Sequence, residues 1–67
     1  MIRLMVNGKC TELVAPIALS KFMQSLGIRS QFVAVAYNGE VIDKKDFGRI
    51  VLYEGDVLEI VRPVGGG

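Results

Sequence analysis

Residues 2–14 have the sequence IRLMVNGKCTELV, and this stretch decides the fold because it predicts a hairpin. Two faces alternate before the turn, with Ile2, Leu4 and Val6 on one and Arg3 and Met5 on the other. Asn7-Gly8 then supplies two residues that tolerate the positive φ of a tight turn. The returning strand over residues 10–14 is expected to place Thr11 and Leu13 inward and Cys10 and Glu12 outward.

A short amphipathic helix is predicted after the hairpin. Pro16 stands where a helix can begin, and Gly27 suits the left-handed position that ends one. Between them, four apolar residues recur at helical spacing and are expected to form one buried face: Leu19, Phe22, Met23 and Leu26. A helix of two to three turns must take most of its stability from packing.

The next segment predicts a second hairpin. Residues 32–37 alternate, with Val33, Val35 and Tyr37 on one face and Phe32, Ala34 and Ala36 on the other. Asn38-Gly39 repeats the turn signal of Asn7-Gly8 and precedes Glu40, Val41 and Ile42.

The last third of the chain predicts two more strands. A polar stretch over residues 43–48 indicates a loop with a short helical turn, and residues 50–53 indicate a short strand. In the final strand, residues 57–61, Leu58 and Ile60 should face the core, while Val57, Glu59 and Val61 face outward.

This order of elements predicts the fold class. One helix covers only one face of a sheet, so the other face stays at least partly exposed. A hairpin, a crossover helix and a strand parallel to one hairpin strand give an α+β, β-grasp (ubiquitin-like) fold with a mixed sheet of four to five strands. We expect the domain to span residues 1–61 and residues 62–67 to form a flexible tail.

Composition narrows the function. The 67 residues carry a net charge of +1, which argues against a nucleic-acid binder. The chain has no histidine and a single cysteine, Cys10, so we expect no metal site, no bound cofactor and no stand-alone enzyme. Cys10 is expected to be an inert strand residue. The chain shows no signal peptide and no apolar run of membrane-spanning length, so a cytoplasmic protein without membrane contact is expected.

The terminal Gly65-Gly66-Gly67 is the strongest functional signal. A C-terminal carboxylate is ionised at neutral pH and is a poor acyl donor until it is activated, for instance as an acyl adenylate. Glycine has no Cβ, leaves the carbonyl unhindered and adapts to a narrow channel. A compact body with a glycine tail therefore suits a protein whose reactive group is the carboxylate of Gly67, with Gly65 and Gly66 providing access.

The chain resembles the ThiS family of sulfur carriers over essentially its whole length. The matching pieces are Val6-Asn7-Gly8, Leu26-Gly27-Ile28, Val33-Ala34-Val35, Asn38-Gly39-Glu40, Glu54-Gly55-Asp56, Glu59-Ile60-Val61 and the Gly66-Gly67 end. The chain departs from the family pattern in two places. The helix N-cap, usually Thr or Ser in this family, falls at Ala18 and should weaken the helix start by about 1 kcal/mol. Residues 44–48 are less family-like and belong to a variable loop.

The resemblance implies a mechanism and partners. A ThiF-like (E1-like) adenylating enzyme would activate Gly67 with ATP and magnesium. Sulfur from a cysteine desulfurase relay would convert the adenylate to a thiocarboxylate. Thiazole synthase, ThiG, would then take the sulfur for thiamine biosynthesis. The carrier itself would supply no catalytic side chain.

The uncovered sheet face is a candidate docking surface. Its expected members are small or branched apolar residues together with one aromatic residue: Phe32, Ala34, Ala36, Val57 and Val61. Val64, just before the glycines, is expected to anchor the tail against a partner.

Three other functions share parts of this pattern. A MoaD-type carrier for molybdopterin synthesis also ends in Gly-Gly on a β-grasp body but usually has a longer chain. A ubiquitin-like protein modifier uses the same adenylate chemistry. An RNA-associated β-grasp module would not need Gly66 and Gly67.

Overall fold

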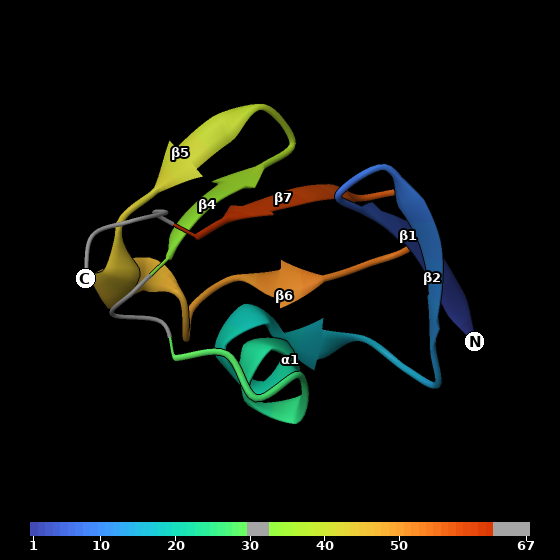
Figure 1. The fold of residues 1–67 in the computed structure, drawn as a ribbon. Helices are drawn as coiled ribbons and strands as arrows, with labels where there is room; N and C mark the ends of the chain where they lie inside the picture. Colours follow the sequence, from blue (N-terminus) through green and yellow to red (C-terminus); the bar gives the residue numbers. More distant parts are fainter. Residues whose placement is uncertain (30–32, 63–67) are drawn as a thin grey trace.

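The computed structural model describes residues 1–29 and 33–62. Figure 1 shows the α-helix below a curved sheet, with the chain coloured from its N-terminus to its C-terminus. The elements, in chain order, are β1 (Ile2–Val6), β2 (Lys9–Leu13), β3 (Ile17–Ala18), α1 (Leu19–Ser25), β4 (Ala34–Tyr37), β5 (Glu40–Ile42), η2 (Lys44–Asp46), β6 (Val51–Leu52) and β7 (Val57–Val61).

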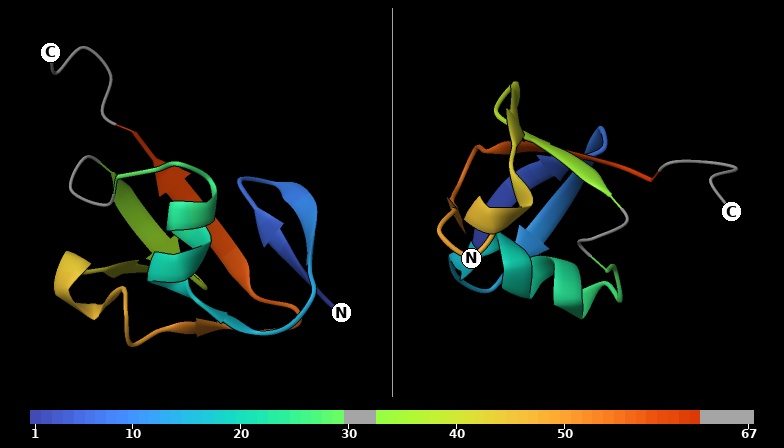
Figure 2. Two further views of the ribbon diagram at one scale, coloured as in Figure 1. Left: turned by 90° about the horizontal axis from the view of Figure 1, so that it is seen from below. Right: turned by 90° about the vertical axis from the view of Figure 1, so that its left-hand side faces the viewer.

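The main sheet has five strands in the order β2-β1-β7-β4-β5. The pairing of β1 with β7 is parallel, and the other three pairings are antiparallel. Helix α1 lies against one face, in front of β4 and β7 when the molecule is seen from below (Figure 2, left). This mixed sheet with one helix on one face is the α+β architecture that the sequence predicts.

Both predicted hairpins form, and each turns on an Asn-Gly pair. In the first, Ile2 pairs with Leu13 and Val6 with Lys9, so the register places Asn7-Gly8 at the tip. In the second, Tyr37 pairs with Glu40 around Asn38-Gly39. The two asparagines have φ values of 51° and 50°, the left-handed conformation that Asn accepts more readily than most residues.

The core lies between the sheet and α1. It contains ten buried apolar residues: Leu4, Leu19, Phe22, Met23, Val33, Val35, Phe47, Leu52, Leu58 and Ile60. Full burial of each larger side chain favours folding by about 1.5–3 kcal/mol. The strand residues in this core, such as Leu4, Val35 and Leu58, are ones that the alternation places on the inward faces, so the predicted inward faces are confirmed. Phe47 is an addition, because it lies within the polar stretch of residues 43–48 and shows no periodic pattern of its own.

The predicted burial of Leu26 is wrong. Leu26 is the C-cap of α1 and is 50% exposed. The helix ends at Ser25, and Gly27, at φ 73°, then reverses the chain. The amide of Ile28 donates to the Met23 carbonyl and that of Gly27 to Gln24, a Schellman arrangement. Ile28 therefore packs against the core in place of Leu26.

The start of α1 also differs from the expectation at Pro16. Ile17 and Ala18 form β3, which pairs with β6 in a separate two-stranded sheet, and the helix begins only at Leu19. Ala18 is the N-cap, as predicted, and makes no side-chain cap hydrogen bond. The first helical amides find other acceptors, because Leu19 donates to the Ile50 carbonyl and Ser20 to the Phe47 carbonyl.

Candidate functional site: the end of β7 and the outer sheet face

The central strand, β7, leads directly into the predicted tail. It lies third of five in the sheet, paired with β1 on one side and β4 on the other. Its last residue, Val61, pairs with Ala34. The tail residues Val64, Gly65, Gly66 and Gly67 lie outside the described residues, so their predicted roles remain predictions. What the described residues define is the anchor from which the tail departs.

The anchor is completed by a side chain from the first turn. Strand β1 ends at Val6, opposite Leu58, so β7 continues past its parallel neighbour. The Ile60 amide donates to Asn7 Oδ1 at 2.7 Å, and Asn7 Nδ2 donates to the Ile60 carbonyl at 3.2 Å. The amide side chain of Asn7 therefore replaces a strand residue beside Ile60 and fixes the backbone two residues before Arg62.

A second asparagine holds the other end of β7. Asn38 exchanges backbone and side-chain bonds with Val57: its amide donates to the Val57 carbonyl at 2.7 Å, and the Val57 amide donates to Asn38 Oδ1 at 2.7 Å. Asn38 Nδ2 also donates to Asp56 Oδ1 at 3.2 Å. The Tyr37 hydroxyl donates to Asp56 Oδ2 at 2.7 Å, and the Tyr53 amide donates to the same oxygen at 2.8 Å.

These contacts shift two pKa values. The hydrogen bond to Asp56, with burial and the nearby negative charge, raises the pKa of Tyr37 to about 12. Burial acts to raise the pKa of Asp56, but hydrogen bonds from the Tyr53 amide, the Tyr37 hydroxyl and Asn38 outweigh it and hold that pKa below its ordinary value. Asp56 is therefore an ionised structural acceptor at neutral pH, and the network stabilises the turn that leads into β7.

The outer sheet face, opposite α1, carries the predicted docking residues that the structure describes. Ala34 is exposed and Ala36 half-buried on β4, while Val57 and Val61 on β7 are 44% and 59% exposed. The register pairs Ala34 with Val61 and Ala36 with Glu59, which places both strands' residues on one surface. Phe32, the remaining predicted member, lies outside the described residues.

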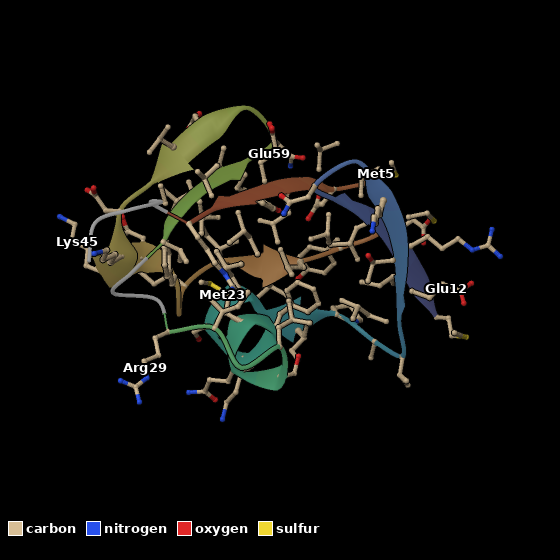
Figure 3. All side chains as sticks on the ribbon, in the orientation of Figure 1. Met5, Glu12, Met23, Arg29, Lys45 and Glu59 are labelled. Carbon is tan, nitrogen blue, oxygen red and sulfur yellow. The ribbon has the colours of Figure 1, made fainter. Side chains whose placement is uncertain are left out.

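Two further apolar residues belong to this face. Met5 on β1 pairs with Val57 and is 37% exposed, and Val41 on β5 pairs with Ala36 and is 82% exposed. Met5 and Glu59 point away from α1, whereas Met23 lies between α1 and the sheet (Figure 3). Sequence reasoning placed Met5 outward but did not join it to β7, because the parallel register of β1 and β7 cannot be read from either strand alone. We call the set Met5, Ala34, Ala36, Val41, Val57 and Val61 the outer apolar patch.

Other candidate chemistry is sparse in the described residues. Cys10 is free and exposed on the same face, opposite Met5. Within residues 1–29 and 33–62 no three His, Cys, Asp or Glu side chains come together as a metal site. In the same part of the chain no helix is long and apolar enough to cross a membrane.

Solved structures of similar fold come from thiamine biosynthesis. A crystal structure titled thiamine biosynthesis protein (ThiS) from Geobacter metallireducens has a TM-score of 0.85 and 28% identity, covering 98% of this chain and all of that one. A solution structure of a thiamine biosynthesis protein from the same organism has a TM-score of 0.79 and 26% identity, covering 98% of this chain and 88% of that one.

Curated relatives are longer proteins. A thiazole synthase from Paramagnetospirillum magneticum is 34% identical over 97% of this chain, and one from Magnetococcus marinus is 34% identical over 92%. The chain spans about a fifth of the length of these relatives, 20% and 19% respectively.

The sequence profile of the ThiS family matches residues 4–67, from the first strand through the terminal glycines. The α+β, β-grasp architecture expected from the order of elements is confirmed by the match to the ThiS crystal structure. The chain belongs to the ThiS family.

Proposed function

We propose that this protein is a sulfur carrier of thiamine biosynthesis whose reactive group is the C-terminal carboxylate of Gly67. The observation that carries the proposal is the family match, which runs to Gly67 and includes the three glycines. The structural relatives titled thiamine biosynthesis proteins favour the thiamine branch over a molybdopterin carrier.

The proposed chemistry takes place at the tail. A ThiF-like adenylating enzyme uses ATP and magnesium to convert the Gly67 carboxylate to an acyl adenylate, releasing pyrophosphate. A thiol reductant cleaves the S–S bond of the persulfide that a cysteine desulfurase relay supplies, and the bisulfide released attacks the carbonyl carbon. The new C–S bond replaces the C–O bond to AMP, and AMP leaves. The product is a thiocarboxylate, which thiazole synthase uses as its sulfur source.

In this proposal the folded domain positions the tail and binds partners, and it does not act as a catalyst. Its contribution is to hold the tail's anchor at Ile60 and Val61 in the centre of the sheet and to present the outer apolar patch to a partner. Exposed apolar residues grouped on one face are typical of an interaction surface. No side chain of the carrier touches the reacting atoms in this mechanism, so the protein acts as a co-substrate.

Thiazole synthase is supported as a partner by the curated relatives. Two proteins named thiazole synthase contain a region similar to nearly all of this chain. A carrier and an acceptor encoded in one polypeptide would meet at high effective concentration. We propose that this carrier instead binds thiazole synthase as a separate protein.

The experiment is the intact mass of the full chain after incubation with ATP, magnesium, a ThiF-type enzyme and sulfide. The starting mass must first show that the purified chain ends at Gly67. The expected result is a gain equal to the replacement of one oxygen by sulfur, located at Gly67 by fragmentation. An unchanged mass, with the enzyme active on its own carrier, would contradict the proposal.

A matched variant tests the role of the tail. Deletion of Gly66 and Gly67 is expected to abolish ATP–pyrophosphate exchange while leaving the circular dichroism spectrum and unfolding midpoint unchanged, because the core that the structure describes is built from residues 4–60. Retained exchange would show that another group is activated. Adducts of high mass on lysines of other proteins would instead favour a protein modifier.

A further inference from the structure

We propose that Glu59 is the specificity-determining charge of the outer apolar patch, and that the partner docking there presents an apolar surface with a Lys or Arg opposite Glu59. This inference rests on the proposed function, because it names the chemistry of the partner that the docking face selects. Glu59 does not act on the reacting atoms and is a binding residue only.

Glu59 stands in the middle of the patch. It lies on the central strand, with Val57 and Val61 two residues away on the same face and Ala36 directly opposite on β4. It is exposed and points away from α1 (Figure 3). Among residues 1–29 and 33–62, the side chain of Glu59 makes no hydrogen bond and no ion pair.

The other charged side chains of this face, unlike Glu59, form an ion pair with each other. On the outward positions of the described strands, the only other charged residues are Arg3 and Glu12, which face each other on β1 and β2. Arg3 Nε donates to Glu12 Oε2 at 3.1 Å, so this pair is internally balanced. The face is left with one unbalanced negative charge, on a chain whose overall charge is +1.

This arrangement discriminates between occupants. In the free protein, water solvates the Glu59 carboxylate at little cost. An apolar partner would strip that water without replacing its hydrogen bonds, which strongly disfavours binding. A cation placed opposite Glu59 offsets the desolvation and fixes the register of the complex.

The same charge argues against a second copy of the chain as the occupant. Two copies packed face to face would bring two Glu59 carboxylates into one apolar interface. Like charges juxtaposed across an interface are unfavourable. We therefore commit to a different protein with a basic residue in an apolar docking surface, and the proposed candidates are the adenylating enzyme and thiazole synthase.

The test measures the affinity of the full chain for each of these two enzymes by isothermal titration calorimetry. Glu59→Lys is compared with Glu40→Lys, which makes the same change in net charge at an exposed strand position away from the patch. For the enzyme that docks on the patch, Glu59→Lys is expected to weaken binding about 30-fold or more, and Glu40→Lys less than about threefold. Reversing the partner's opposing cation should restore much of the loss.

The outcomes separate the two proposals. Equal affinities for the two variants with both enzymes, while the wild-type chain binds and gains sulfur at Gly67, would overturn the role of Glu59 and leave the carrier function standing. A wild-type chain that binds neither enzyme and gains no sulfur would overturn both. A wild-type dimer in sedimentation velocity that Ala36→Asp dissociates would also overturn the inference, because a second copy would then cover the face.

Discussion

The two hairpin turns have the same dipeptide and the same backbone but different partners. Asn7-Gly8 and Asn38-Gly39 both place Asn in the left-handed region, at φ 51° and 50°, and both hairpins flank β7. Asn7 bonds the backbone of Ile60 in a half-buried setting, at the end that leads to the tail. Asn38 bonds Val57 and Asp56 in an exposed setting, at the start of the strand.

The difference shows which features of the two turns follow from the local sequence and which depend on distant residues. Positive φ is a property of the dipeptide, so the turns are predictable from neighbours in sequence. The bond from Asn7 to Ile60 spans 53 residues and depends on β7 running past the end of β1. The same residue type thus acts as a turn former in both places and as the anchor of the tail strand in only one.

The largest expected effect is at Asn7. Asn7→Gly keeps the positive φ and removes only the side chain, so it isolates the two bonds to Ile60. At about 1 kcal/mol for each half-buried hydrogen bond, the free energy of unfolding should fall by about 2 kcal/mol. Chemical denaturation measures this loss, and faster hydrogen exchange at the Ile60 amide should accompany it.

The matched control is Asn38→Gly, which should cost about 1 kcal/mol because water replaces bonds that are already exposed. Equal losses at the two positions, or an unchanged exchange rate at Ile60, would show that Asn7 is no more than a turn residue.

A smaller effect, with a signature in pH, is expected from Tyr37→Phe. The variant removes the 2.7 Å bond to Asp56 and should cost about 1 kcal/mol at neutral pH. The pKa of Asp56 is lowered in the fold, so its contribution is present above about pH 4 and is lost as the pH falls through the folded-state pKa. The pKa of Tyr37 is raised, so its contribution is present below about pH 10 and is lost as the pH rises toward about 12.

Unfolding free energies across this pH range test both signs. In Tyr37→Phe, the loss of unfolding free energy at alkaline pH should vanish, because the titrating hydroxyl is gone. The loss at acid pH should become smaller but remain, because Asp56 keeps its hydrogen bonds from Tyr53 and Asn38. If the unfolding free energy of Tyr37→Phe falls as steeply at acid pH as that of the wild type, the Tyr37 hydroxyl does not lower the Asp56 pKa.

Much of the fold follows from local patterns, and the reason is physical. Alternation assigns Leu4, Val35 and Leu58 to the core because strand side chains have a period of two. Pattern alone misplaced Leu26, since the helical spacing of apolar residues continues one position beyond Ser25, the last residue of the helix. It also missed Phe47, whose burial depends on the contact of its loop with the start of α1.

The candidate site divides in the same way. Outward alternation identified Ala34, Ala36, Val57 and Val61, whereas Met5 joined them only through the parallel pairing of β1 with β7. Glu59 was placed outward by the same alternation, but its lack of a partner among the described residues becomes visible only when the neighbouring strands are in register. Local periodicity thus predicts which way a side chain points, and only the assembled sheet defines its neighbours.

The smallest expected effect is at Ala18, where the local signal is missing and long-range bonds replace it. An N-cap without a side-chain oxygen ordinarily weakens a helix by about 1 kcal/mol. Here the Ile50 and Phe47 carbonyls already accept from the amides of Leu19 and Ser20. Ala18→Ser should therefore raise the free energy of unfolding by less than about 0.5 kcal/mol, measured by chemical denaturation beside the wild type. A gain of about 1 kcal/mol, the usual contribution of an N-cap side chain, would mean that the hydrogen bonds to the carbonyls of residues 47 and 50 contribute little in solution. The start of α1 would then depend on its own sequence, as a turn such as Asn38-Gly39 does, and not on distant partners as Asn7 does.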